Sequence, residues 1–68
     1  MKPKIIQRFF DDPDFGKVKH ISIPDINGHA VEAMEFNNSG HFVVRVDNNP
    51  EVTISANHLM EYIKQETQ

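Results

Sequence analysis

Apolar and polar residues alternate along the middle of the chain with the two-residue period of β-strands. Residues 16–54 hold four such stretches, and the breaks between them are rich in Asn, Asp, Gly and Pro. The first break is Asn27-Gly28, the strongest short-range hairpin signal, because both residues tolerate positive φ. Residues 37–40 and 47–51 supply the other two breaks. The pattern therefore predicts a four-stranded antiparallel β-meander.

The turns also predict how the strands align. A three-residue loop with Gly40 in the left-handed conformation would pair Asn37 with His41. The other two turns then extend one apolar row across the four strands, consisting of Ile21, Met34, Val44 and Ile54. Together with the helix described next, this register predicts a core of twelve residues: Ile21, Ile23, Met34, Phe36, Phe42, Val44, Val46, Val52, Ile54, Leu59, Met60 and Ile63.

After Ile54 the apolar period changes from that of a strand to that of a helix. Ser55 or Asn57 can cap the first turn of a helix over residues 55–65. Its apolar stripe comprises Ala56, Leu59, Met60 and Ile63. We expect this helix to pack on the apolar sheet face, which makes the predicted class α+β.

Residues 1–15 form an N-terminal arm whose conformation the pattern leaves open. Its four large apolar residues, Ile5, Ile6, Phe9 and Phe10, fit a short helix, an edge strand or an irregular segment. In one arrangement the arm covers a second sheet face that contains Val31, Ala33 and Val43. In the alternative, residues 4–10 add a fifth strand and curl the sheet into an SH3-like small barrel. Either way, residues 1–68 are expected to form one small domain.

Composition narrows the function classes. The chain of 68 residues has no cysteine, which excludes a disulfide scaffold and thiolate metal sites. No stretch resembles a membrane span or the apolar region of a signal peptide, so we expect a cytoplasmic protein without membrane contacts. The three glycines are isolated, so there is no phosphate loop, and no serine has a nucleophile-elbow context. We therefore expect no enzyme activity and no cofactor.

The histidines suggest one candidate metal site. In the predicted register, His20 lies opposite Glu35, and His41 lies two strands away on the same face. Such a cluster would supply nitrogen and oxygen ligands suited to zinc. Structural zinc normally takes four ligands, and this diagonal offers three, so His20, Glu35 and His41 are candidates while no metal is predicted.

The N-terminal segment combines cations with aromatic residues. Its five cations are Lys2, Lys4, Arg8, Lys17 and Lys19, and Phe9, Phe10 and Phe15 are interleaved among them. Cations suit phosphates and aromatic faces suit bases, so this segment is a candidate nucleic-acid-binding site. Three aspartates in the same segment and a pI near 5.7 weigh against this alternative.

Protein–protein interaction has the broadest physical basis. A meander leaves two open edges that can accept a further strand. The sheet face opposite the helix would present His20, Glu35, Val43 and Arg45, a mixed polar and apolar patch suited to a partner. The sequence therefore predicts a non-enzymatic interaction module, either an adaptor or regulator of another protein or a homodimer.

Overall fold

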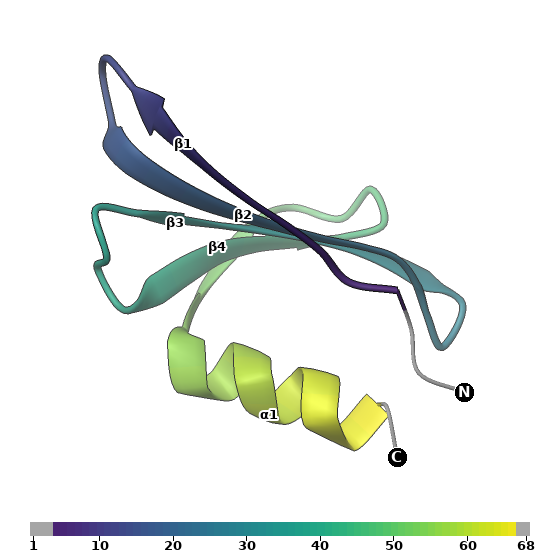
Figure 1. Cartoon of the computed structure of the whole chain (residues 1–68). Helices are drawn as coiled ribbons and strands as arrows, with labels where there is room; N and C mark the ends of the chain where they lie inside the picture. Colours follow the sequence, from purple (N-terminus) through teal and green to yellow (C-terminus); the bar gives the residue numbers. More distant parts are fainter. Residues whose placement is uncertain (1–3, 67–68) are drawn as a thin grey trace.

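The computed structural model describes residues 4–66 as one antiparallel sheet with a C-terminal helix (Figure 1). The sheet has five strands in meander order, and the helix lies on one of its faces. The elements are β1 (Ile6–Asp12), β2 (Gly16–Ile26), β3 (His29–Phe36), β4 (His41–Val46), β5 (Val52–Ser55) and α1 (Ala56–Glu66). We call the side of the sheet that carries α1 the core face and the opposite side the outer face.

The predicted α+β class is confirmed, but the strand count is wrong by one. The N-terminal arm forms β1 and pairs with β2, so that Phe10 lies opposite Val18 and Ile6 opposite Ser22. It extends the sheet and does not cover the outer face as one arrangement proposed. The barrel alternative correctly added an N-terminal strand. However, β1 and β5 are the two opposite edges of the strand order, so the sheet stays open.

The β2–β3 turn is the predicted Asn-Gly hairpin, with φ of 54° at Asn27 and 84° at Gly28. The predicted register is nevertheless shifted by one residue, because the pairing is irregular between Ile23 and Ile26. The extra residue falls at Pro24-Asp25, where proline lacks the N–H that a continuous ladder needs. As a result, Ile21 lies opposite Ala33 and not opposite Met34.

The β3–β4 turn also differs from the prediction by one residue. Gly40 has positive φ as expected, but Asn37 and Asn38 have positive φ as well. The Ser39 N–H bonds to the Phe36 carbonyl at 3.2 Å, so four residues connect the strands where three were predicted. Met34 consequently lies opposite Val43.

These two shifts exchange the faces of β3 alone. Val31 and Ala33 point to the core face and are buried, whereas Met34 and Phe36, predicted as core, lie on the outer face. The β4–β5 register differs from the prediction by two residues, which keeps each face unchanged. The observed apolar row across the sheet is Ile21, Ala33, Val44 and Val52.

The core lies between the sheet and α1. The buried cluster comprises Ile21, Ile23, Ile26, Val31, Ala33, Phe42, Val44 and Leu59. Leu59, 1% exposed, is the central contact of the helix, and Ala56 and Ile63 pack beside it. The predicted cap at Ser55 is confirmed, since its Oγ accepts the His58 N–H at 3.2 Å. The core predictions for Val52 and Met60 are wrong, because these residues are 55% and 49% exposed.

A second, smaller apolar cluster lies on the outer face at the β1–β2 end. Val18 is buried at 3% exposure although it points away from the helix. Phe10 and Phe36 flank it in register, and the Phe15 ring lies 5.2 Å from the Phe36 ring. The molecule, with extents of 37 × 21 × 18 Å, therefore has apolar contacts on both sides of the sheet.

Within residues 4–66, no helix is long and apolar enough to cross a bilayer.

Candidate interaction surface

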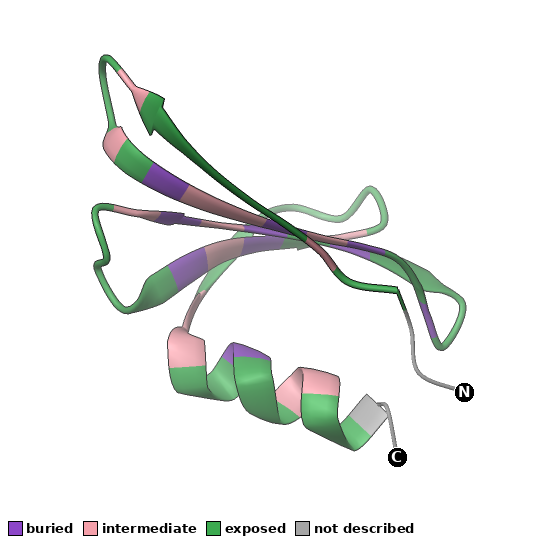
Figure 2. Cartoon of the chain, in the orientation of Figure 1, coloured by how far each residue is buried: buried purple, intermediate pink, exposed green. Residues whose placement is uncertain are grey.

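The hairpin formed by β1 and β2 projects beyond the part of the sheet that the helix covers (Figure 1). The helix contacts β4 and β5, near the edge of the sheet opposite to β1. Most of β1 is solvent-exposed, as Figure 2 shows. Four of the six large hydrophobic side chains that are exposed in residues 4–66 belong to this end of the chain: Ile5, Phe9, Phe10 and Phe15. We call this region the hairpin surface, comprising residues 5–19.

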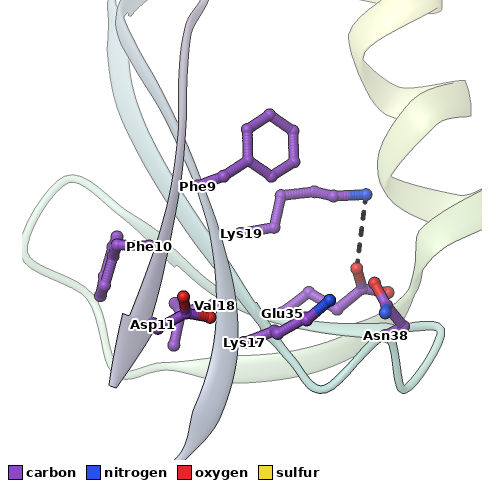
Figure 3. A pocket seen from close by; sticks show the side chains of 8 residues that line it. All are labelled: Phe9, Phe10, Asp11, Lys17, Val18, Lys19, Glu35 and Asn38. Atoms are coloured by element: carbon purple, nitrogen blue, oxygen red, sulfur yellow. Dashed lines mark ion pairs between the residues drawn. The ribbon is translucent and has the colours of Figure 1, made fainter. Parts of the chain in front are cut away.

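The hairpin surface borders a cavity of about 320 Å³. Phe9, Lys17, Lys19 and Glu35 are among the residues that line it (Figure 3). The Lys19 Nζ atom lies 5.8 Å from the centre of the Phe9 ring, within range of a cation–π contact. Phe9 itself is 69% exposed, so the cavity has an aromatic wall that is open to solvent.

Glu35 contributes a buried carboxylate to the lining of this cavity. Among residues 4–66, Glu35 is the only charged residue that is buried, at 6% exposure. Its Oε1 atom pairs with Lys19 Nζ at 3.5 Å, and its Oε2 atom accepts the Gly40 N–H at 2.9 Å. Both carboxylate oxygens therefore have partners, which offsets the cost of burying the charge. The contact also ties the β3–β4 turn to β2.

The tip of the hairpin is fastened to the same turn by Asn37. The Asn37 N–H donates to the Lys17 carbonyl at 2.7 Å, and Asn37 Oδ1 accepts the Lys17 N–H at 3.1 Å. Gly16, beside them, has a φ of 77° and no room for a Cβ against the Asn37 side chain. Two neighbouring turns are thus locked together, which positions the otherwise uncovered hairpin.

The predicted outer-face patch is only partly assembled. His20, Val43 and Arg45 line a shallow groove of about 150 Å³ together with Met34. Glu35, the fourth predicted member, lies on the core face, because the bulge in β2 sets it opposite Lys19 and sets His20 opposite Met34. Arg45 donates to Glu51 Oε1 at 3.0 Å, so its charge is already paired with a carboxylate.

The same register correction separates the candidate metal ligands. His20 and His41 lie on the outer face, and Glu35 lies on the core face. Within residues 4–66, no group of three or more His, Cys, Asp or Glu side chains is arranged to hold a metal ion.

The candidate nucleic-acid residues are divided between the two faces. Lys17 and Lys19 lie on the core face, whereas Arg8 lies on the outer face opposite His20. Lys4 is exposed just before β1, and Lys2 lies outside the described residues. Lys19 pairs with Glu35, and Lys17 lies opposite Asp11 in the ladder. The cations therefore do not form one uninterrupted basic face.

One polar contact that the sequence pattern did not reveal joins the start of β3 to the turn after its neighbour β4. Asp47 accepts the Ala30 N–H at 3.0 Å and contacts His29 Nδ1 at 2.8 Å. The Ala30 hydrogen bond, followed by the His29 contact, holds the pKa of the Asp47 carboxyl below its usual value. The sequence did place Asp47 in a stretch of turn-forming residues, which agrees with its positive φ. It gave no signal that identified the residues that Asp47 contacts. This pair fastens the β2–β3 hairpin to the turn after β4.

Comparison with known proteins gave no relative: no family model, curated protein or solved structure matches the chain.

Proposed function

We propose that this protein is a non-enzymatic protein–protein interaction module that docks through its hairpin surface. The supporting observation is that exposed apolar side chains are concentrated on residues 5–15, where the helix gives no cover. Phe9 is 69% exposed and Phe15 is 57% exposed. Large exposed aromatic residues are favourable anchors for a partner, because they bury much apolar area for little loss of conformational entropy.

The open edge strand provides the second element of the docking surface. β1 is bonded on one side to β2 and has no strand on its other side in the sheet order. Its outward N–H and C=O groups can therefore pair with a further strand, while Phe9 and Phe10 project to opposite faces. The docking site proposed here is therefore the hairpin surface, and not the outer-face patch of His20, Val43 and Arg45 that was predicted from the sequence.

The test compares three variants as baits. Phe9→Thr removes the most exposed aromatic side chain of the hairpin. Val52→Thr is its matched control, because Val52 is 55% exposed on the opposite edge strand. Arg45→Glu alters the outer-face groove. We expect each variant to keep the wild-type urea midpoint.

Chemical crosslinking of the purified protein and quantitative affinity capture then measure which contacts each variant retains. We expect Phe9→Thr to weaken specific association, with itself or with a captured protein, at least tenfold, and Val52→Thr to leave it unchanged. Association that survives Phe9→Thr but is lost in Arg45→Glu would place the docking site on the outer face. If the wild type shows no specific association with itself or with another protein, the proposal is wrong.

Nucleic-acid binding is the competing function, and one observation favours it. On the core face, the exposed Phe9 ring lies beside Lys17 and Lys19, which is the combination that stacks bases and contacts phosphates. A gel-shift assay at low salt with a labelled single strand tests it. A complex that weakens steeply with added salt and on Lys17→Glu would support this function over protein docking.

A further inference from the structure

β1 has an uneven charge distribution that bears on what can pair with it. Lys4 and Arg8 lie at or before its first half, and Asp11 and Asp12 end it. A second copy of β1 laid parallel would bring like charges together. A second copy laid antiparallel would bring the cations of each chain to the carboxylates of the other. The open edge is therefore electrostatically self-complementary in one direction only.

Two-fold symmetry limits the registers that an antiparallel pair of β1 strands can adopt. The axis must pass beside one residue, which then lies opposite its own copy. An axis at Arg8 would set two guanidinium groups against each other. An axis at Phe9 would set Arg8 opposite Phe10 of the second copy. An axis at Phe10 sets Arg8 of each chain opposite Asp12 of the other and brings two Phe10 rings together at the centre.

The structure already holds Asp12 in place for such a contact. Its Oδ1 atom accepts the Asp14 N–H at 2.8 Å and the Phe15 N–H at 3.1 Å, which fixes the carboxylate at the end of the strand. Arg8 and Asp12 both belong to the outer face of β1, as does Phe10, which is 45% exposed. These three side chains could therefore meet those of a second copy on one side of a joined sheet.

We propose that two copies of this chain associate by antiparallel pairing of β1 with β1 about a two-fold axis at Phe10. The proposal rests on the proposed docking function and names its partner as a second copy. Two five-stranded sheets then become one continuous sheet, in which the only pairings that cross the axis are those of β1. Alternative occupants of the edge are a strand of another protein or a nucleic acid, and both are outcomes of the test.

The expected interface is small. With the axis at Phe10, only residues 8–12 of each β1 face the same segment of the second copy. That paired length is about 17 Å at about 3.4 Å per residue, so the pairing buries less than a standard interface. Such contacts belong to the weak, transient class, and sedimentation should therefore be measured from about 10 μM to about 1 mM protein. We expect the wild type to shift from monomer to dimer over that range.

Charge exchange tests the pairing of Arg8 with Asp12. Arg8→Asp places two pairs of like charges across the axis, and Asp12→Arg does the same with the opposite sign. We expect each variant alone to dimerise at least tenfold more weakly than the wild type. An equimolar mixture of the two restores both opposite-charge pairs and should form mixed dimers. Failure of the mixture to associate, with both variants folded by circular dichroism, would overturn the pairing.

Cysteine crosslinking tests the register independently of charge, and the natural chain has no cysteine to interfere. Residues directly opposite across an antiparallel pair have Cα atoms about 4.5–5.5 Å apart, close to the separation that a disulfide spans. We expect Phe10→Cys to oxidise to a covalent dimer at least tenfold faster than Phe9→Cys. Thr53→Cys, exposed on β5, is the control for random collision.

The outcomes separate the two proposals. A dimer that crosslinks fastest through Phe9→Cys or Thr53→Cys overturns the self-pairing proposed here. A wild type that stays monomeric to 1 mM also overturns it. If that monomer still binds another protein through Phe9, the docking function stands and only the identity of the partner is wrong. If it binds a nucleic acid and no protein, both proposals fail.

Discussion

Gly16→Ala provides a sharp test of how the hairpin is fastened to the sheet. Gly16 has a φ of 77°, where a side chain costs about 1–2 kcal/mol. An added Cβ would also lie 3.0 Å from the Asn37 Cγ atom and closer still to Oδ1. The Asn37 side chain would have to move, which would break its hydrogen bond from the Lys17 N–H at a cost of about 0.5–1.5 kcal/mol.

We therefore expect Gly16→Ala to lower the free energy of unfolding by about 1.5–3.5 kcal/mol. For a domain of this size, each kcal/mol lowers the melting temperature by about 4–8 °C. The measurement is urea unfolding followed by circular dichroism, supported by a thermal melt. A loss of this size is a large fraction of the stability of a small domain.

Two further variants isolate the contribution of Asn37. Gly28→Ala introduces the same backbone strain at a φ of 84°, but no heavy atom lies within 4 Å of the added Cβ. Gly28→Ala should therefore lower the free energy of unfolding only by the cost of the backbone strain, about 1–2 kcal/mol. Asn37→Gly keeps its own positive φ accessible and removes the obstructing side chain, so Gly16→Ala should cost less in that background. Equal losses at Gly16 and Gly28, or a strictly additive double variant, would refute the reasoning.

Three other predictions concern the core and its polar contacts. Leu59→Ala should lower the free energy of unfolding by about 2–5 kcal/mol in a urea titration, whereas Met60→Ala, at an exposed position, should change it by less than about 0.5 kcal/mol. Glu35→Ala should speed amide exchange at Gly40, while Glu35→Gln keeps an acceptor there and should not; equal exchange in both would contradict the hydrogen bond. The folded-state pKa of Asp47 is lowered, so its stabilising effect should be present above the usual pKa and disappear as the pH falls through the folded value. The difference in urea midpoint between wild type and Asp47→Asn should accordingly shrink between pH 6 and pH 2, and a constant difference would argue against the ionised contact.

The sequence pattern predicted most of the elements and missed the faces of one strand. The turn chemistry of Asn27-Gly28 and the change of period after Ile54 are local signals, and both the hairpin and the helix follow them. β3 was inverted because each of its faces combines apolar residues with one glutamate, so its alternation could not reject a one-residue slip.

Two local features caused that slip. The bulge at Pro24-Asp25 adds one residue to β2, and the left-handed Asn37-Asn38 pair lengthens the next turn by one. The residue types at both sites are compatible with several turn or bulge conformations, so the sequence alone does not determine which conformation forms. Because the two errors act in opposite senses, the faces of β2, β4 and β5 were still predicted correctly.

The candidate interaction surface was harder to predict than the fold. The outer-face patch lost Glu35 through the inversion of β3, and the metal candidates were separated by the same error. The aromatic and basic residues of the N-terminal segment were identified from sequence. Their exposure could not be, because phenylalanines at such positions are more often buried, and only the position of the helix leaves Phe9 uncovered.

The one-sided position of the helix also determines how the molecule should open. α1 contacts β4 and β5, so β1 is held by its ladder to β2 and by the aromatic contacts around Val18. β1 can detach without exposing Leu59 or the main core, and its amides should therefore exchange through a lower-energy opening than those of β4. A strand that adds to its free edge would suppress that opening. Hydrogen exchange in β1 would then report occupancy of this edge directly, even for a complex too weak to isolate.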